Sequence, residues 1–104
     1  MDKVLPIIRE FVKQRDWSQF HTIDNLAKSI VIEAGELLEC FQWDDVFDKQ
    51  EVQDELADVL IYCLMMADKL EISVEAIVLE KMKKNADKYP IEKSKGKNTK
   101  YSKL

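Results

Sequence analysis

Turn-forming residues are scarce in this chain, which has only two glycines and two prolines among its 104 residues. Many-stranded sheets and Gly-rich phosphate loops need such residues at their turns, so neither fits this composition. The default prediction is therefore an all-helical fold in one small domain, residues 1–104. The longest unbroken apolar stretch, Val59–Ala67, has nine residues, whereas roughly 20 are needed to span a bilayer. We predict no transmembrane helix.

Hydrophobic spacing predicts four helices. They are expected over residues 2–14, 22–41, 49–70 and 73–87. Thr22 and Ser73 stand where N-cap side chains accept backbone N–H groups. The segment DWSQFH, residues 16–21, breaks the apolar pattern between the first two helices. The basic tail, residues 91–104, has no apolar periodicity and is expected to be a loop or to become ordered on binding.

The third predicted helix becomes apolar on every side from Val59 onward. A helix with this pattern is buried all round. One layer of four short helices can hardly cover it, so we expect a second subunit to supply part of the cover. Ile61 and Met65 face away from the stripe set by Val52 and Leu56, and we expect them to lie against that subunit.

Charge is unevenly distributed in this chain, whose formal net charge is −4. The tail carries five lysines and one glutamate, so residues 1–90 hold a net charge of −8. An acidic body argues against nucleic-acid binding, which needs a basic face, and suits a site that holds cations. The N-terminal segment lacks the apolar core of a secretory signal, and Cys40 and Cys63 fall within apolar helical patterns. We expect a cytoplasmic protein whose two thiols are reduced and buried.

Two pairs of carboxylates stand three residues apart, Glu33 with Glu36 and Glu55 with Asp58. Such spacing puts each pair on one helix face, and the short loop between the helices makes them antiparallel neighbours. A hard divalent cation would relieve the repulsion among the four, and oxygen-only ligands favour Mg²⁺ or Mn²⁺ over zinc. Apolar neighbours distinguish these pairs, but 20 acidic residues also produce such spacing by composition alone, so a solvated acidic face is the other interpretation. The single histidine, His21, excludes a ferritin-like di-iron centre.

Aromatic residues flank these carboxylates in the sequence. Trp17, His21 and Trp43 lie in the two breaks beside the second helix. Tyr62 follows Asp58 by one turn on the same face. Aromatic side chains in loops can stack on a nucleobase, although more often they cap a hydrophobic core. On spacing alone both interpretations stay open.

Five segments follow one another in a characteristic order: RDWSQFH, IEAGELLECFQW, DELADVLIYCLMMAD, KMKKNADKYP and KSKGKNTKY. Together they resemble the MazG-like all-α nucleoside triphosphate pyrophosphohydrolases, specifically their short dCTP pyrophosphatase branch. The resemblance extends from about Arg9 to Tyr101. It implies a four-helix bundle assembled as a dimer or a dimer of dimers. It also implies hydrolysis of a nucleoside triphosphate, here dCTP or a modified dCTP, to the monophosphate and pyrophosphate.

The resemblance also implies site residues by position. The magnesium ligands would be Glu33, Glu36, Glu55 and Asp58, the four acids already singled out. The base and sugar pocket would be formed by Trp17, His21, Trp43, Tyr62, Lys81 and Asn85. Attack of a water molecule at the α phosphorus needs no side-chain nucleophile, and we nominate Glu36 as the general base.

Two positions depart from the family pattern. Ile32 stands where fuller relatives have a second acid directly before the first ligand, so a two-metal arrangement is not implied. Asp24 stands where the branch often has a cation, although Lys28, one turn further on, could point the same way. The alternative function is a catalytically silent helical oligomer that binds nucleotide or a partner protein.

Overall fold

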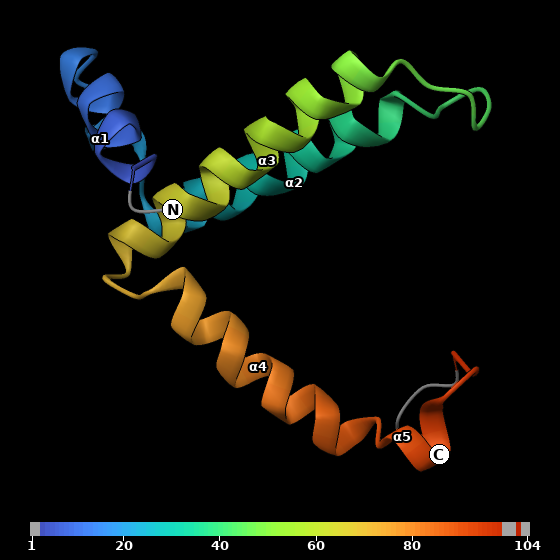
Figure 1. Cartoon of the computed structure of the whole chain (residues 1–104). Coiled ribbons are helices and arrows are strands. Elements are labelled where there is room, and N and C mark those ends of the chain that lie inside the picture. Colours follow the sequence, from blue (N-terminus) through green and yellow to red (C-terminus); the bar gives the residue numbers. More distant parts are fainter. Residues whose placement is uncertain (1–2, 99–101, 103–104) are drawn as a thin grey trace. The chain divides into compact units, whose positions relative to one another are not determined.

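The computed structural model describes residues 3–98 and 102, and within them it contains helices and no strand. The all-α prediction is confirmed for this part of the chain. In chain order the elements are α1 (Leu5–Gln14), the 3₁₀ turn η1 (Ser18–Phe20), α2 (Ile23–Glu39), α3 (Lys49–Lys69), α4 (Val74–Lys88) and α5 (Ile91–Ser94). Figure 1 shows these elements, which form two compact units, residues 1–71 and 72–104. None of the helices in the described part is long and apolar enough to cross a membrane.

The α2–α3 pair is the framework of the first unit. Figure 1 shows the two helices side by side and antiparallel, joined by the loop that follows α2. Thr22 caps α2 as predicted, because its hydroxyl accepts the backbone N–H of Asn25 at 3.3 Å. Asp48 caps α3 through its carboxylate, which accepts the N–H of Gln50 at 3.0 Å. The helix bounds agree with the predicted ones to within two residues.

Helix α1 packs against α3, next to the end at which α3 finishes. It begins at Leu5, later than the predicted start at Asp2, which lies outside the described residues. The Arg9 guanidinium forms an ion pair with the Asp68 carboxylate of α3, and its Nε donates to Oδ2 at 3.0 Å. This pair ties the two helices together.

Few apolar side chains are buried within the described residues. The buried ones are Leu26, Leu64 and Ala67, which lie on α2 and α3. Within the single chain α3 is not covered on every side, since Leu60 remains about half exposed, and the cover expected from a second subunit stays a prediction. Both cysteines are free, but Cys63 is exposed and Cys40 only half-buried, so the prediction of buried thiols is wrong for the single chain. The cause is that α1 and α2 cover only part of the circumference of α3.

Ile61 and Met65 differ from expectation in what covers them. Both are half-buried and line a cavity beneath α1 of their own chain, where a second subunit was expected. The apolar face of α1 explains this, because its residues Ile8 and Val12 line the same cavity. The exposed apolar side chains of α3 lie elsewhere on its surface.

The second unit consists of α4 and α5. Ser73 caps α4 as predicted, with its hydroxyl accepting the N–H of Ala76 at 3.2 Å. The tail was expected to be a loop or to become ordered on binding, and its first residues form the single turn α5. Pro90, in an extended conformation, starts this turn, and Gly96, at a φ of 76°, follows its end. One helical turn is too short to show apolar periodicity, which is why the sequence pattern missed it.

Candidate functional site

Three of the four predicted ligand carboxylates converge between α2 and α3. Glu33, Glu55 and Asp58 each offer an oxygen, and these oxygens lie within 4.8 Å of one another. The i, i+3 spacing on α3 and the antiparallel packing of α2 produce this convergence. Glu33 and Glu55 are half-buried, whereas Asp58 is exposed at the rim.

Glu33 and Glu55 each have one carboxylate oxygen without a protein partner. Oε2 of Glu33 and Oε2 of Glu55 are both buried and accept no hydrogen bond. A buried acceptor without a donor is unfavourable, and for a carboxylate more so, because its charge is also removed from water. A cation held between the two oxygens would satisfy both. The donor set fits a hard divalent cation, since it consists of carboxylate oxygens alone.

The electrostatics of this carboxylate cluster (Glu33, Glu36, Glu55 and Asp58) agree with its geometry. Burial raises the pKa of Glu33, and the negative charges of the other three acids raise it further. Burial also raises the pKa of Glu55, again with contributions from Glu36 and Asp58. Glu36 is itself exposed and lies outside the three-oxygen group, although its charge acts on both buried acids. The cluster therefore carries more negative charge than its surroundings neutralise.

A cavity of about 310 Å³ adjoins the cluster under α1. Asp58 is in its wall, so the cavity and the carboxylates share one residue. Three predicted pocket residues also line it, namely Trp17, His21 and Tyr62. Burial, followed by the charge of Lys69, lowers the pKa of His21, which favours a neutral imidazole. Burial and the nearby carboxylates raise the pKa of Tyr62, which favours a neutral phenol able to donate a hydrogen bond.

The rest of the cavity wall is apolar and was not anticipated as part of the site. It comes from α1 and α3: Ile7, Ile8, Phe11, Val12, Ile61 and Met65. The residues of α1 belong to one apolar helix face, so their periodicity was the signal available in the sequence. A helical stripe shows which face is covered but not whether a cavity remains under it. The wall suits a planar, largely apolar group placed beside the carboxylates.

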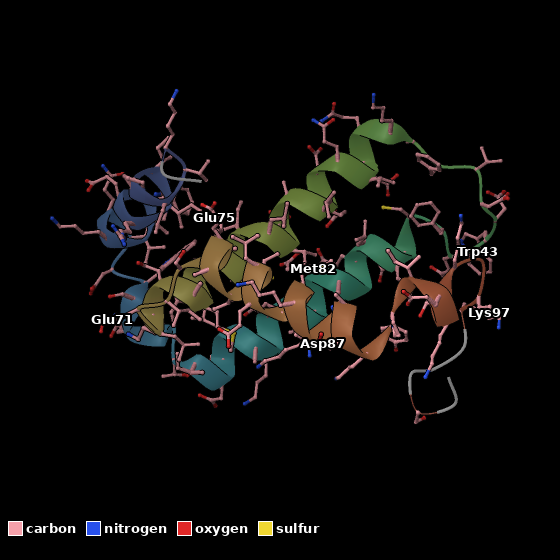
Figure 2. The ribbon with its side chains drawn as sticks, turned by 60° about the horizontal axis from the view of Figure 1, so that its bottom comes forward. Trp43, Glu71, Glu75, Met82, Asp87 and Lys97 are labelled. Carbon is pink, nitrogen blue, oxygen red and sulfur yellow. The ribbon has the colours of Figure 1, made fainter. Side chains whose placement is uncertain are left out.

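The remaining predicted pocket residues are not brought to this cavity within the first unit. Trp43 lies in the loop after α2, with 88% of its surface exposed, and Figure 2 shows it at the loop end of the α2–α3 pair. Lys81 and Asn85 lie four residues apart on α4, on one helix face of the second unit. Their part in the site stays a prediction.

From the sequence, Lys28 could have pointed the same way as the cation that the resemblance implies at position 24. Its ammonium instead lies 3.6 Å from the carboxylate of Asp24, and both side chains are exposed. The Thr22 hydroxyl also donates to Asp24, at 2.6 Å. Lys28, which could have supplied the missing positive charge, is thus paired with Asp24 itself.

Comparison with known proteins connects this geometry to a family. A model described as the MazG-like family matches residues 28–104. The chain is 37% identical to dCTP pyrophosphatase 1 of Rattus norvegicus and 36% identical to that of Homo sapiens, over 105 residues. These alignments cover 91% of this chain but 62% of each relative, so the chain spans less than two thirds of their length. The crystal structure of a pyrophosphatase from Archaeoglobus fulgidus DSM 4304 is similar at a TM-score of 0.81 and 47% identity, covering 86% of this chain and 92% of that one.

Proposed function

The chain belongs to the MazG-like family, and on this basis we propose that it is a Mg²⁺-dependent nucleoside triphosphate pyrophosphohydrolase. The proposed substrate is dCTP or a modified dCTP, and the products are the nucleoside monophosphate and pyrophosphate. The observation that carries the proposal is the convergence of Glu33, Glu55 and Asp58, with two buried oxygens that have no partner. Acids in a small domain are normally solvated or paired, and the buried oxygens of Glu33 and Glu55 are neither.

The carboxylate cluster is the proposed metal site. Glu33, Glu55 and Asp58 would hold Mg²⁺, or Mn²⁺, with Glu36 beside them. When bound, such a cation shields the charge of the polyphosphate and lowers the pKa of a coordinated water. The acids would fix the position of the cation, and through it that of the triphosphate.

Glu36 is the proposed general base. It is exposed and lies outside the three-oxygen group, so it is the carboxylate of the cluster that need not be a metal ligand. A water molecule would lose that proton to Glu36 as its oxygen bonds to the α phosphorus. The bond between the α phosphorus and the α–β bridging oxygen would then break, and pyrophosphate would leave with the electron pair. Atoms and charge balance without a covalent enzyme intermediate.

The cavity under α1 is the proposed base and sugar pocket. It shares Asp58 with the cluster, so a base in the cavity would leave its phosphates near the carboxylates. Trp17 would stack on the base, and His21 and Tyr62 would offer polar edges. Trp43, Lys81 and Asn85 remain predicted nucleotide contacts from their positions in the sequence.

Homo-oligomeric assembly, as a dimer or a tetramer, is part of the proposal. Val31 and Leu38 of α2 are both 70% exposed, and with Gly35 they form one apolar strip at i, i+4 and i+7 spacing. A second copy is the proposed cover for this strip. We expect Val31→Glu to reduce the mass measured by light scattering at micromolar concentration, with Lys28→Glu, an exposed position on the same helix, as the control. A wild-type protein that is monomeric in this measurement would contradict the assembly.

The decisive experiment is pyrophosphate release from each canonical and 5-modified deoxynucleoside triphosphate in the presence of Mg²⁺. We expect dCTP or a 5-modified dCTP to be hydrolysed fastest, and EDTA to abolish the reaction. Glu33→Gln keeps the size of the side chain but removes a ligand charge, so it is the matched inactive control. Nucleotide binding without pyrophosphate release would contradict the proposal. It would support the alternative function, a catalytically silent helical oligomer that binds nucleotide or a partner protein.

A further inference from the structure

We propose that Arg15 is a positioning residue, which holds the aromatic wall of the cavity, Phe11 and Trp17, in the orientation that receives the base. The proposal rests on the function proposed above, because it assumes that the cavity takes a nucleobase. Arg15 itself does not line the cavity, whereas both rings do. Arg15 would therefore act on the two rings and not on the base directly.

The guanidinium of Arg15 is directed at both rings. Its Cζ lies 3.6 Å from the centroid of the Phe11 ring and 6.0 Å from that of Trp17. Both distances are within the range in which a cation is attracted to an aromatic face. Nη1 of Arg15 also donates to the carbonyl oxygen of Phe11 at 3.1 Å. The planar guanidinium is thus held in place by a hydrogen bond to the residue on which it stacks.

The two rings contact each other edge to face. Their centroids are 5.7 Å apart, and their planes are inclined at 72°. Yet 47% of the surface of Phe11 and 44% of that of Trp17 remain exposed. Their neighbours, Arg15 included, therefore leave almost half of each residue accessible to solvent. The guanidinium supplies an additional contact, and it acts on both rings at once.

Backbone hydrogen bonds in the segment between Phe11 and Trp17 fix the position of the Trp17 backbone. Helix α1 ends in a Schellman motif, in which the N–H of Trp17 donates to Val12 O and that of Asp16 to Lys13 O, both at 3.1 Å. Asp16 adopts the left-handed conformation that this motif needs, at a φ of 52°. The side-chain amide of Gln19 donates to the carbonyl oxygen of Asp16 at 3.0 Å. These bonds place the Cα of Trp17 but do not by themselves determine the rotamer of its side chain.

Arg15 is the residue that restricts this remaining freedom. Stacking on a base is most effective when the ring is already in the bound orientation, because less side-chain entropy is then lost on binding. Removing the guanidinium should weaken nucleotide binding without changing the carboxylates that carry the chemistry. The expected signature is a higher KM with kcat nearly unchanged.

The test uses Arg15→Met and Arg15→Lys in a Trp43→Phe background, in which Trp17 is the sole tryptophan. Arg15→Met keeps the aliphatic stem without the charge or the donor, and Arg15→Lys restores only the charge. Arg9→Met is the matched control, since it also removes a guanidinium from α1, but one that pairs with Asp68. For each variant, acrylamide quenching and anisotropy of Trp17 fluorescence are measured without nucleotide. The KM and kcat for dCTP are measured by pyrophosphate release.

We expect Arg15→Met to raise KM by about two- to five-fold, and to leave kcat within about two-fold. Trp17 should become more accessible to acrylamide and less ordered, with Arg15→Lys between Arg15→Met and the Arg15 background. Arg9→Met should lower thermal stability but leave Trp17 fluorescence as it was. The proposal is overturned if Trp17 is unaffected by Arg15→Met, or if Arg9→Met changes it equally. Loss of hydrolysis in every protein would refute the proposed function, whereas the fluorescence comparison would still decide the role of Arg15.

Discussion

Two acids on helix α3, Glu55 and Asp68, have opposite surroundings. Glu55 is half-buried among other carboxylates, and burial together with their charges raises its pKa. Asp68 accepts hydrogen bonds from Arg9 of α1, which lower its pKa despite partial burial. The folded state thus favours the protonated form of one acid and the ionised form of the other. The difference separates a proposed metal ligand from a group that stabilises the fold.

The comparison also indicates which part of the first unit is unfavourable without a ligand. Like charges and unpartnered buried oxygens at the carboxylate cluster oppose folding. The Arg9–Asp68 pair favours it by joining α1 to α3. A fold that retains such a cluster next to a cavity fits a site whose missing charge comes with its ligand.

The largest expected difference between the two acids is in activity. Glu55→Gln should reduce the rate of pyrophosphate release at saturating dCTP and Mg²⁺ by about 100-fold or more, because it removes one ligand charge. Asp68→Asn should stay within about three-fold of wild type, since an exposed ion pair contributes little to the site. Activity that survived Glu55→Gln would show that the carboxylate cluster is not the site. Circular dichroism of both variants verifies that each remains helical.

The response to metal should also separate the two regions. Mg²⁺ at 100 times its dissociation constant should raise the free energy of unfolding of the wild type by about 2.7 kcal/mol. Glu55→Gln should lose most of this gain, whereas Asp68→Asn should keep it. Urea denaturation at constant protein concentration and ionic strength measures the effect. An equal gain in both variants would place the cation outside the cluster.

Helical spacing was sufficient to predict the convergence of Glu33, Glu55 and Asp58. Acids three residues apart share a face, and a short loop forces the neighbouring helices to be antiparallel. The cavity was less accessible to this reasoning, because periodicity identifies the covered face of a helix but not what covers it. That is why Met65 was assigned to a subunit contact and α1 was not recognised as part of the cavity. The same limit applies to Trp43, because its position in the sequence does not determine how its loop is folded or that its side chain is exposed.

The pH dependence of stability should differ between the two acids when metal is absent. Glu33 has a raised pKa, so the folded state is destabilised by its ionisation above its usual pKa of 4.5. Glu33→Gln should be more stable than wild type at pH 7, and this margin should shrink as the pH falls toward 4.5. Asp68 has a lowered pKa, so its stabilisation is present above its usual 3.8 and is lost as the pH falls below that value.

These two margins are measured by urea denaturation of each variant and the wild type in EDTA, at intervals of pH. The comparison between variant and wild type cancels the titration of groups that do not interact with the substituted acid, such as His21. If the Glu33→Gln margin stayed constant from pH 7 to 4.5, the cluster would not be raising the pKa of Glu33. If the Asp68→Asn margin closed well above pH 3.8, the ion pair would not be lowering that of Asp68.

The smallest expected effect is the stability lost with the Arg9–Asp68 pair. Asp68→Asn should lower the thermal midpoint by about 2–4 °C in dilute buffer, because both side chains are partly exposed and the pair is screened by water. Glu10→Gln, which removes a neighbouring exposed acid of α1, should shift it less. Sodium chloride at about 0.5 M should reduce the loss.

The double variant Arg9→Met, Asp68→Asn should be less destabilised than the sum of the two single variants, since one interaction can be lost only once. Additive losses would mean that each residue acts through other contacts, and the contrast between Asp68 and Glu55 would then reduce to burial alone.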